Sequence, residues 1–151
     1  MKILIVDDEE MIRGVLREYV EFEGNEADEA ADGMEAVKKC RENDYDLILM
    51  DVMMPKLDGF SAVKEIRKDK DVPVIMLSAR GEEYDKLFAF EIGVDDYVTK
   101  PFSPKEVMAR IHAVTKRKAK KKEDENRVLK FEGLEIDMAG RNVYVDGEKA
   151  V

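Results

Sequence analysis

An aspartate follows a run of apolar residues near the middle of the sequence. Residues 47–50 are apolar, Asp51 comes next, and Pro55 and the pair Asp58-Gly59 then predict a turn. A short apolar run that ends at turn residues is typical of a buried parallel strand. In open α/β sheets, ligands bind in the crevice beyond the carboxyl ends of the strands. Asp51 is therefore expected to be a nucleophile that accepts a phosphoryl group.

Three other strand-like runs also end in polar side chains. The residues that follow these runs are Asp7 with Asp8, Ser78, and Lys100. Right-handed crossovers bring the carboxyl ends of parallel strands to the same edge of a sheet, so these side chains are expected to meet Asp51 there. Polar residues that merely cap helices would explain any one of these strand ends, but they explain all four together poorly.

Three carboxylates at one edge would repel each other. At a separation of ~4 Å and an effective dielectric near 20, each pair costs about 4 kcal/mol. A hard divalent cation would remove this cost, and an oxygen-lined site with positions left for water suits Mg²⁺, which would also bridge to a phosphoryl oxygen. Lys100 is a flexible point charge suited to a second phosphoryl oxygen, and the Ser78 hydroxyl could hydrogen-bond a third.

The sequence around these polar residues predicts five strands that alternate with five helices. After the first strand, apolar residues recur at helical spacing up to Gly24, a residue type that commonly ends helices. These residues are Met11, Ile12, Val15, Leu16, Tyr19 and Val20. Residues 26–31 are short and acidic, as an edge strand can be, and the next helix is expected to turn Met34, Val37 and Cys40 inward. Because each crossover contains a helix, we expect a doubly wound parallel α/β domain.

Residues 2–117 resemble a response-regulator receiver domain, with every motif in order. The resemblance rests on the acidic pair, Asp51 within DVMMPKLDG, Ser78 before an alanine, and Lys100 before a proline. It implies the flavodoxin-like strand order 2-1-3-4-5 with five helices, and phosphoryl transfer from a sensor histidine kinase to Asp51. Such a protein is a signalling switch that catalyses only its own phosphoryl transfer and autodephosphorylation.

The same resemblance implies a role for individual residues. Asp8 and Asp51 would bind Mg²⁺ directly (Mn²⁺ is also possible), Asp7 would act through water, and the Met53 backbone carbonyl would complete the protein ligands. The residues expected to hold the phosphoryl group are Ser78, Ala79 and Lys100, and the Lys100–Pro101 bond is expected to be cis.

Ser78 and Tyr97 resemble the switch pair of the family. Phosphorylation would turn the hydroxyl toward the phosphoryl group, and the Tyr97 ring would move inward; an ordinary half-buried strand aromatic is the alternative for Tyr97. Met53 and Arg80 occupy the two positions that tune hydrolysis of the acyl phosphate in the family, and a bulky Met53 suggests slow hydrolysis.

The segment EIGVDDYVTKPFSPKEVMARI is similar to the OmpR/PhoB type of transcriptional regulator. This type implies a symmetric homodimer through the fourth helix, fifth strand and fifth helix when phosphorylated. The expected dimer face pairs Lys86 with Glu106, Asp95 with Arg110, and Asp96 with Arg117, around an apolar patch that includes Leu87, Phe90 and Met108. Solvated helix faces would look similar. Exposed ion pairs contribute only about 0–1 kcal/mol each, so they would set register more than affinity.

The sequence changes character after the predicted receiver domain of residues 1–117. Residues 118–126 read as a charged linker, continuing a basic run in which six of residues 116–122 are Lys or Arg. Residues 127–151 resemble an incomplete N-terminal β-platform of a winged-helix DNA-binding domain, with strand-like runs at residues 128–131, 134–137 and 142–145 and a hairpin signal at Asp146-Gly147. The full-length protein would then control DNA binding and transcription, whereas this chain should not bind DNA specifically.

Composition limits the other classes of function. The net charge is −9, and without the six positive charges of residues 116–122 the rest of the chain sums to −15. This negative charge disfavours nucleic acid as a partner of that part of the chain. No apolar stretch approaches the ~20 residues of a membrane span, no signal peptide is expected, and a lone Cys40 fits a reducing compartment, so a cytoplasmic protein is predicted. A phosphohydrolase of the haloacid dehalogenase type would need a second acid where Met53 stands. A receiver-like module that is never phosphorylated is disfavoured by the complete acidic set.

Overall fold

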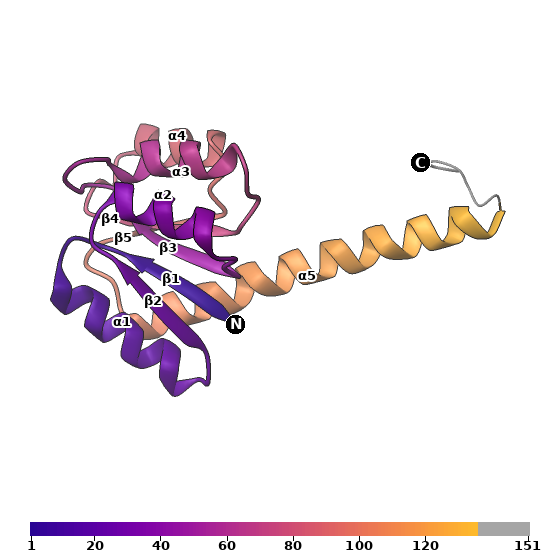
Figure 1. The fold of residues 1–151 in the computed structure, drawn as a ribbon, viewed down its shortest axis with the longest axis horizontal. Helices are drawn as coiled ribbons and strands as arrows, with labels where there is room; N and C mark the ends of the chain where they lie inside the picture. Colours follow the sequence, from indigo (N-terminus) through magenta and orange to yellow (C-terminus); the bar gives the residue numbers. More distant parts are fainter. Residues whose placement is uncertain (136–151) are drawn as a thin grey trace. The chain divides into compact units, whose positions relative to one another are not determined.

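A computed structural model describes residues 1–135 of the chain, with side chains described as far as residue 125. Five parallel strands form one sheet with the order β2-β1-β3-β4-β5 (Figure 1). The strands are β1 (Lys2–Val6), β2 (Glu26–Ala30), β3 (Leu47–Asp51), β4 (Val74–Ser78) and β5 (Asp96–Thr99). The predicted order is confirmed, and the acidic strand β2 lies at an edge of the sheet as expected.

Helices cover both faces of the sheet. They are α1 (Glu10–Phe22), α2 (Gly33–Glu42), α3 (Gly59–Arg67), α4 (Glu83–Glu91) and α5 (Pro104–Glu135). Residues of α2, α3 and α4 pack against one face, and residues of α1 and the first turns of α5 pack against the other (Figure 1). The apolar strands supply both cores because their side chains alternate: Ile48 and Met50 of β3 point to one core, Leu47 and Leu49 to the other.

Two helices bury a narrower stripe than their sequences suggested. In α1, Leu16 and Val20 are buried, whereas Met11 is 80% exposed and Val15 is also exposed. In α2, the expectation that Met34 points inward is wrong, because this side chain is exposed. At about 100° per residue, the buried residues of each helix fall on one side and these methionines fall outside that stripe.

The chain beyond residue 117 differs from the predicted linker and strands. Helix α5 continues to Glu135, so the expected linker (118–126) and the expected strand residues 128–131 are helical. No glycine or proline occurs between residues 116 and 132, where Lys, Arg and Glu favour a helix, and a few isolated strands are not stable. The expected strand 134–137 extends past the described residues, and the predicted strand 142–145 and the hairpin lie outside them. Contacts within the chain separate residues 1–115 from residues 116–151. The proposed domain assignment stays a prediction.

Candidate phosphoryl-acceptor site

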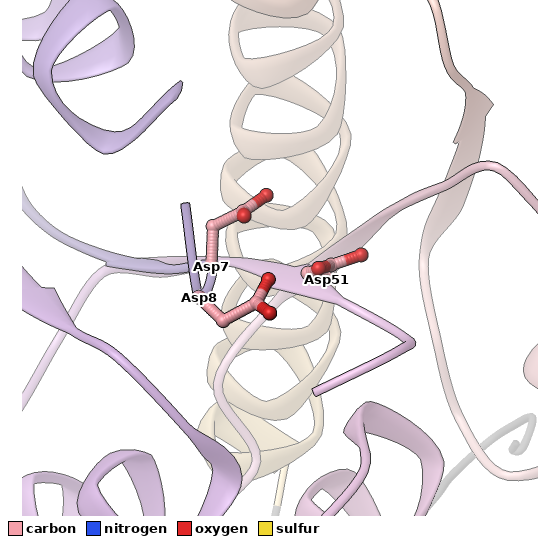
Figure 2. A group of neighbouring side chains, drawn as sticks. All are labelled: Asp7, Asp8 and Asp51. Carbon is pink, nitrogen blue, oxygen red and sulfur yellow. The ribbon is translucent and has the colours of Figure 1, made fainter. Parts of the chain in front are cut away.

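Three aspartates meet at the carboxyl ends of two neighbouring strands, β1 and β3. Asp7 and Asp8 follow β1, and Asp51 is the last residue of β3, which pairs directly with β1. One carboxylate oxygen from each aspartate lies within 4.8 Å of the other two (Figure 2). Asp7 and Asp51 are buried and Asp8 is exposed. The structure therefore brings together the three acids that the strand-end pattern selected.

Asp7 and Asp8 differ in how many hydrogen bonds their carboxylates already accept. One oxygen of Asp7 accepts the backbone N–H of Glu9 at 2.9 Å, and the other accepts the Lys100 ammonium at 3.0 Å. Among the described residues, none donates a hydrogen bond to the Asp8 carboxylate or forms an ion pair with it. Asp8 thus keeps its oxygens for a ligand, whereas those of Asp7 have protein donors.

Lys100 follows β5 and lies among the acids. Its ammonium is 3.0 Å from Asp7 and 3.5 Å from Asp51. Although burial opposes its charge, hydrogen bonding to Asp7 and the attraction of Asp51 hold the Lys100 pKa above its usual range. The Lys100–Pro101 peptide bond is cis, as the resemblance implied. The side chain is therefore a fixed cation at this edge of the sheet.

Asp51 is strained electrostatically. Burial, followed by the repulsion of Asp7, raises its pKa to about 6, with Asp8 adding to the effect and Lys100 opposing it. The single nearby ammonium does not compensate the negative charge of the cluster. A cation bound here would lower the free energy of the ionised site.

The loop after β3 holds Asp51 through close backbone contacts. The N–H of Gly59 donates to the Val52 carbonyl at 2.8 Å, and a Cβ at Gly59 would lie 2.1 Å from the Asp51 carbonyl oxygen. Only glycine fits this approach. Met53, in the same loop, has an exposed side chain, and the proposed use of its carbonyl as a metal ligand stays a prediction.

Ser78 and Tyr97 are linked through the backbone of Arg80. The Ser78 hydroxyl oxygen accepts the Arg80 N–H at 2.9 Å, and the Tyr97 hydroxyl donates to the Arg80 carbonyl. The Tyr97 side chain is only 6% exposed, and burial raises its pKa. The ring therefore lies inward in this structure, more deeply than a half-buried strand aromatic. Ala79, which lies between Ser78 and Arg80 in the sequence, lines a groove with Lys100.

Asp85 is a buried acid that the sequence analysis missed. It lies in the first turn of α4 and is 2.8 Å from the guanidinium of Arg80. That guanidinium also lies 5.8 Å from the ring centroid of Phe60. An acid in the first turn of a helix is a common favourable placement, so the sequence carried no signal that this one is buried.

The charged residues of the predicted dimer face have partners within the chain. Arg110 lies 3.0 Å from Asp96 and 3.2 Å from Glu106, and Asp95 lies 3.6 Å from Arg67. Arg110 and Asp95 therefore have other partners here than the ones predicted across a dimer. The three predicted pairs between protomers stay a prediction.

The apolar part of that face is only partly exposed. Leu87 and Phe90 on α4 are exposed, but Met108 of α5 is buried against the sheet, so its expected place in the apolar patch of the dimer face is wrong. The cause is its place in the apolar stripe with Val107 and Ile111 that packs against the sheet. Lys86 is half-buried and Arg117 is exposed.

A sequence model described as the response regulator receiver domain matches residues 3–112. The chain belongs to the response regulator receiver family. This receiver is 46% identical over 151 residues to the transcriptional regulatory protein ResD of Bacillus subtilis (strain 168), covering 97% of this chain and 63% of ResD. It is 41% identical over 153 residues to the transcriptional regulatory protein SrrA of Staphylococcus aureus (strain NCTC 8325 / PS 47), covering 98% of this chain and 64% of SrrA. The receiver chain thus spans a little over three fifths of these relatives.

Solved structures support the same assignment. The receiver domain of the Francisella response regulator 1452 is 40% identical with a TM-score of 0.74, over 78% of this chain and 98% of that one. A CheY-like receiver domain protein from Methanospirillum hungatei JF-1 is 27% identical with a TM-score of 0.76, over 80% of this chain and 97% of that one. The receiver is therefore part of a two-component signalling family whose matched relatives include transcriptional regulators. Within its described residues, no helix is long and apolar enough to cross a membrane.

Proposed function

We propose that this receiver accepts a phosphoryl group on Asp51 from a sensor histidine kinase, with Mg²⁺ as cofactor. The observation that carries the proposal is the meeting of Asp51 with two further acids and the Lys100 ammonium at one edge of the sheet. In the reaction, an oxygen of the ionised Asp51 carboxylate attacks phosphorus, the bond from phosphorus to the donor nitrogen breaks, and the imidazole leaves. Lys100 is in place to bind a phosphoryl oxygen and neutralise its charge.

The donor set fits a hard divalent cation, because carboxylate oxygens gather with one exposed, unengaged member. Asp8 and Asp51 would hold Mg²⁺ directly and Asp7, whose oxygens have protein donors, would act through water, with the Met53 carbonyl as the remaining protein ligand. When bound, the cation supplies charge neutralisation between two anionic reactants. The Ser78 hydroxyl, whose oxygen accepts the Arg80 N–H, would turn its proton toward a phosphoryl oxygen. Ala79 leaves space there because its side chain is small.

Acetyl phosphate in place of the kinase tests the acceptor directly. The protein with Mg²⁺ should gain one phosphoryl group in an adduct that is acid-stable and base-labile, measured by intact mass. Asp51→Asn should abolish the adduct, and Asp71→Asn, which removes an exposed acid of equal charge, should not. An adduct that persists in Asp51→Asn would refute the assignment, and no adduct in the wild type would favour an interaction module that is not phosphorylated.

The output is proposed to pass through Ser78 and Tyr97 to a homodimer built on α4, β5 and α5. Support comes from the link of both hydroxyl groups to Arg80 and from the exposed Leu87 and Phe90. Phosphorylated protein should elute as a dimer in size-exclusion chromatography. Lys86→Glu and Glu106→Lys should each weaken the dimer, and the double reversal should restore it. Equal dimerisation of all four proteins would count against this face.

For the whole protein we propose control of transcription through a DNA-binding effector domain, in the cytoplasm. Support comes from relatives named transcriptional regulatory proteins, of which the chain spans a little over three fifths. A longer protein that contains this receiver should bind DNA, and treatment with acetyl phosphate should raise its affinity for DNA. DNA affinity that does not respond to phosphorylation would contradict it.

A further inference from the structure

Arg13 of α1 contacts the backbone of the acidic turn. Its Nη1 donates to the Asp7 carbonyl oxygen at 2.8 Å, while its Nε lies 2.8 Å from the Glu29 carboxylate. The Arg13 side chain is only 15% exposed. One planar guanidinium therefore joins the turn after β1 to strand β2, in the fixed fork geometry that arginine offers.

The contacted oxygen belongs to the peptide that links Asp7 to Asp8. Holding that oxygen fixes the plane of the peptide from which the Asp8 side chain extends. The Asp8 carboxylate itself has no hydrogen bond or ion pair from the described residues. Its direction toward Asp51 therefore depends on the backbone, which is also held by the Asp7 N–H donated to the Ala30 carbonyl at 3.1 Å and by the Glu9 N–H donated to the Asp7 side chain.

Glu29 provides a rigid anchor for Arg13. It lies on β2 opposite Ile5 of β1, and its second oxygen is 2.8 Å from Arg17. Hydrogen bonding to Arg13 holds the Glu29 pKa below its usual range, so this anchor stays ionised at neutral pH. Strand β2, at the edge of the sheet, thus carries a carboxylate that holds Arg13 beside the acidic turn.

We propose that Arg13, anchored by Glu29, is a positioning residue that orients Asp8 for Mg²⁺. The inference rests on the proposed function, because it assumes that the acid cluster binds the cation. Arg13 itself needs no contact with the metal. Partners behind the ligands of a metal site commonly change metal affinity by 10–100-fold when they are removed.

The charge of Arg13 and its hydrogen bond to the Asp7 carbonyl predict opposite effects of its removal on Mg²⁺ binding. Removing a cation near three carboxylates should strengthen Mg²⁺ binding if only long-range electrostatics act. Removing the restraint on the Asp7–Asp8 peptide should weaken binding, because Asp8 must then be ordered when the metal binds. Arg17 provides the matched control, since it lies on the same helix and contacts Glu29 but has no hydrogen bond to the Asp7 carbonyl among the contacts of the described residues.

The test is a calorimetric Mg²⁺ titration of the unphosphorylated protein and four variants. Arg13→Gln should weaken binding about tenfold, Glu29→Gln should weaken it less, and Arg13→Lys should fall between wild type and Arg13→Gln because lysine keeps one donor. Arg17→Gln should bind as tightly as wild type or slightly tighter. Thermal unfolding in EDTA shows whether each variant is folded.

Binding by Arg13→Gln as tight as that by Arg17→Gln would overturn the proposal. Should Arg13→Gln fail to fold, unaltered affinity in Glu29→Gln and Arg13→Lys would overturn it equally. At saturating Mg²⁺ the Asp51 adduct should form in Arg13→Gln, as expected of a positioning residue. A wild-type protein that binds no Mg²⁺ would instead refute the proposed function, and this inference with it.

Discussion

The Lys100 ammonium lies 3.5 Å from the Asp51 carboxylate, at the ends of two strands that β4 separates. The same ammonium is closer to Asp7, at 3.0 Å. Lys100 is thus shared between two buried acids. Burial and the repulsion of Asp7 still raise the Asp51 pKa to about 6, although the attraction of Lys100 opposes this rise. This excess of negative charge is the physical basis of the predictions on stability and metal affinity below.

Asp51→Asn should stabilise the metal-free protein at neutral pH. Because the folded-state pKa of Asp51 is above the unfolded value, ionisation costs stability as pH rises from about 4 through 6. The variant should therefore exceed wild type by about 2–3 kcal/mol at pH 7.5 and by much less at pH 4. Urea unfolding in EDTA at both pH values measures the difference. A gain that does not change between these pH values would contradict the origin assigned here.

Magnesium affinity should fall in mild acid. Protons compete with the cation for Asp51, so below pH 6 the affinity should drop by about tenfold per pH unit, while between pH 7 and 8 it should change little. Calorimetric titrations from pH 5 to 8 measure this profile. A midpoint near pH 4 would show that Asp51 titrates as an ordinary exposed aspartate.

Gly59→Ala should destabilise the protein and impair the acceptor. The new Cβ would meet the Asp51 carbonyl oxygen at 2.1 Å, and the shift of backbone needed to relieve it should cost about 1–3 kcal/mol. Gly14→Ala is the control, because nothing lies within 4 Å of its Cβ in the middle of α1. That change should stabilise by about 0.5–1 kcal/mol. Urea unfolding and acetyl phosphate labelling of both variants provide the measurements, and similar effects of the two would count against the close contact.

Arg80→Ala should cost more stability than removal of an ordinary surface arginine. It leaves the buried Asp85 carboxylate without its 2.8 Å partner, which should cost about 1–3 kcal/mol. Arg41→Ala is the comparison, since that arginine lies 3.7 Å from Glu65 in an exposed pair worth about 0–1 kcal/mol. Thermal or urea unfolding at pH 7 distinguishes them. Equal losses would mean that Asp85 tolerates burial without Arg80.

The sequence alone predicted the sheet and the acids that meet at its edge. A parallel α/β sheet brings the carboxyl ends of its strands together, so residues that follow apolar runs, such as Asp7, Asp51 and Lys100, could be assigned to one site from their order along the chain. The edge position of β2 was also predicted, because a short acidic strand suits an edge. These features depend on patterns local to the chain and on one rule of topology.

Only the tertiary structure decided which partners these residues have. Burial of Asp85 against Arg80 and the contact of Arg13 with the Asp7 carbonyl depend on how helices pack on the sheet. The exposure of Met34 and the burial of Met108 depend on which side of each helix packs against the sheet. The helical state of residues 128–131 in α5 likewise reflects helix propensity where a strand would need neighbours to pair with. The contacts of Asp85 and Arg13 follow from distances between elements far apart in sequence, which no local pattern encodes.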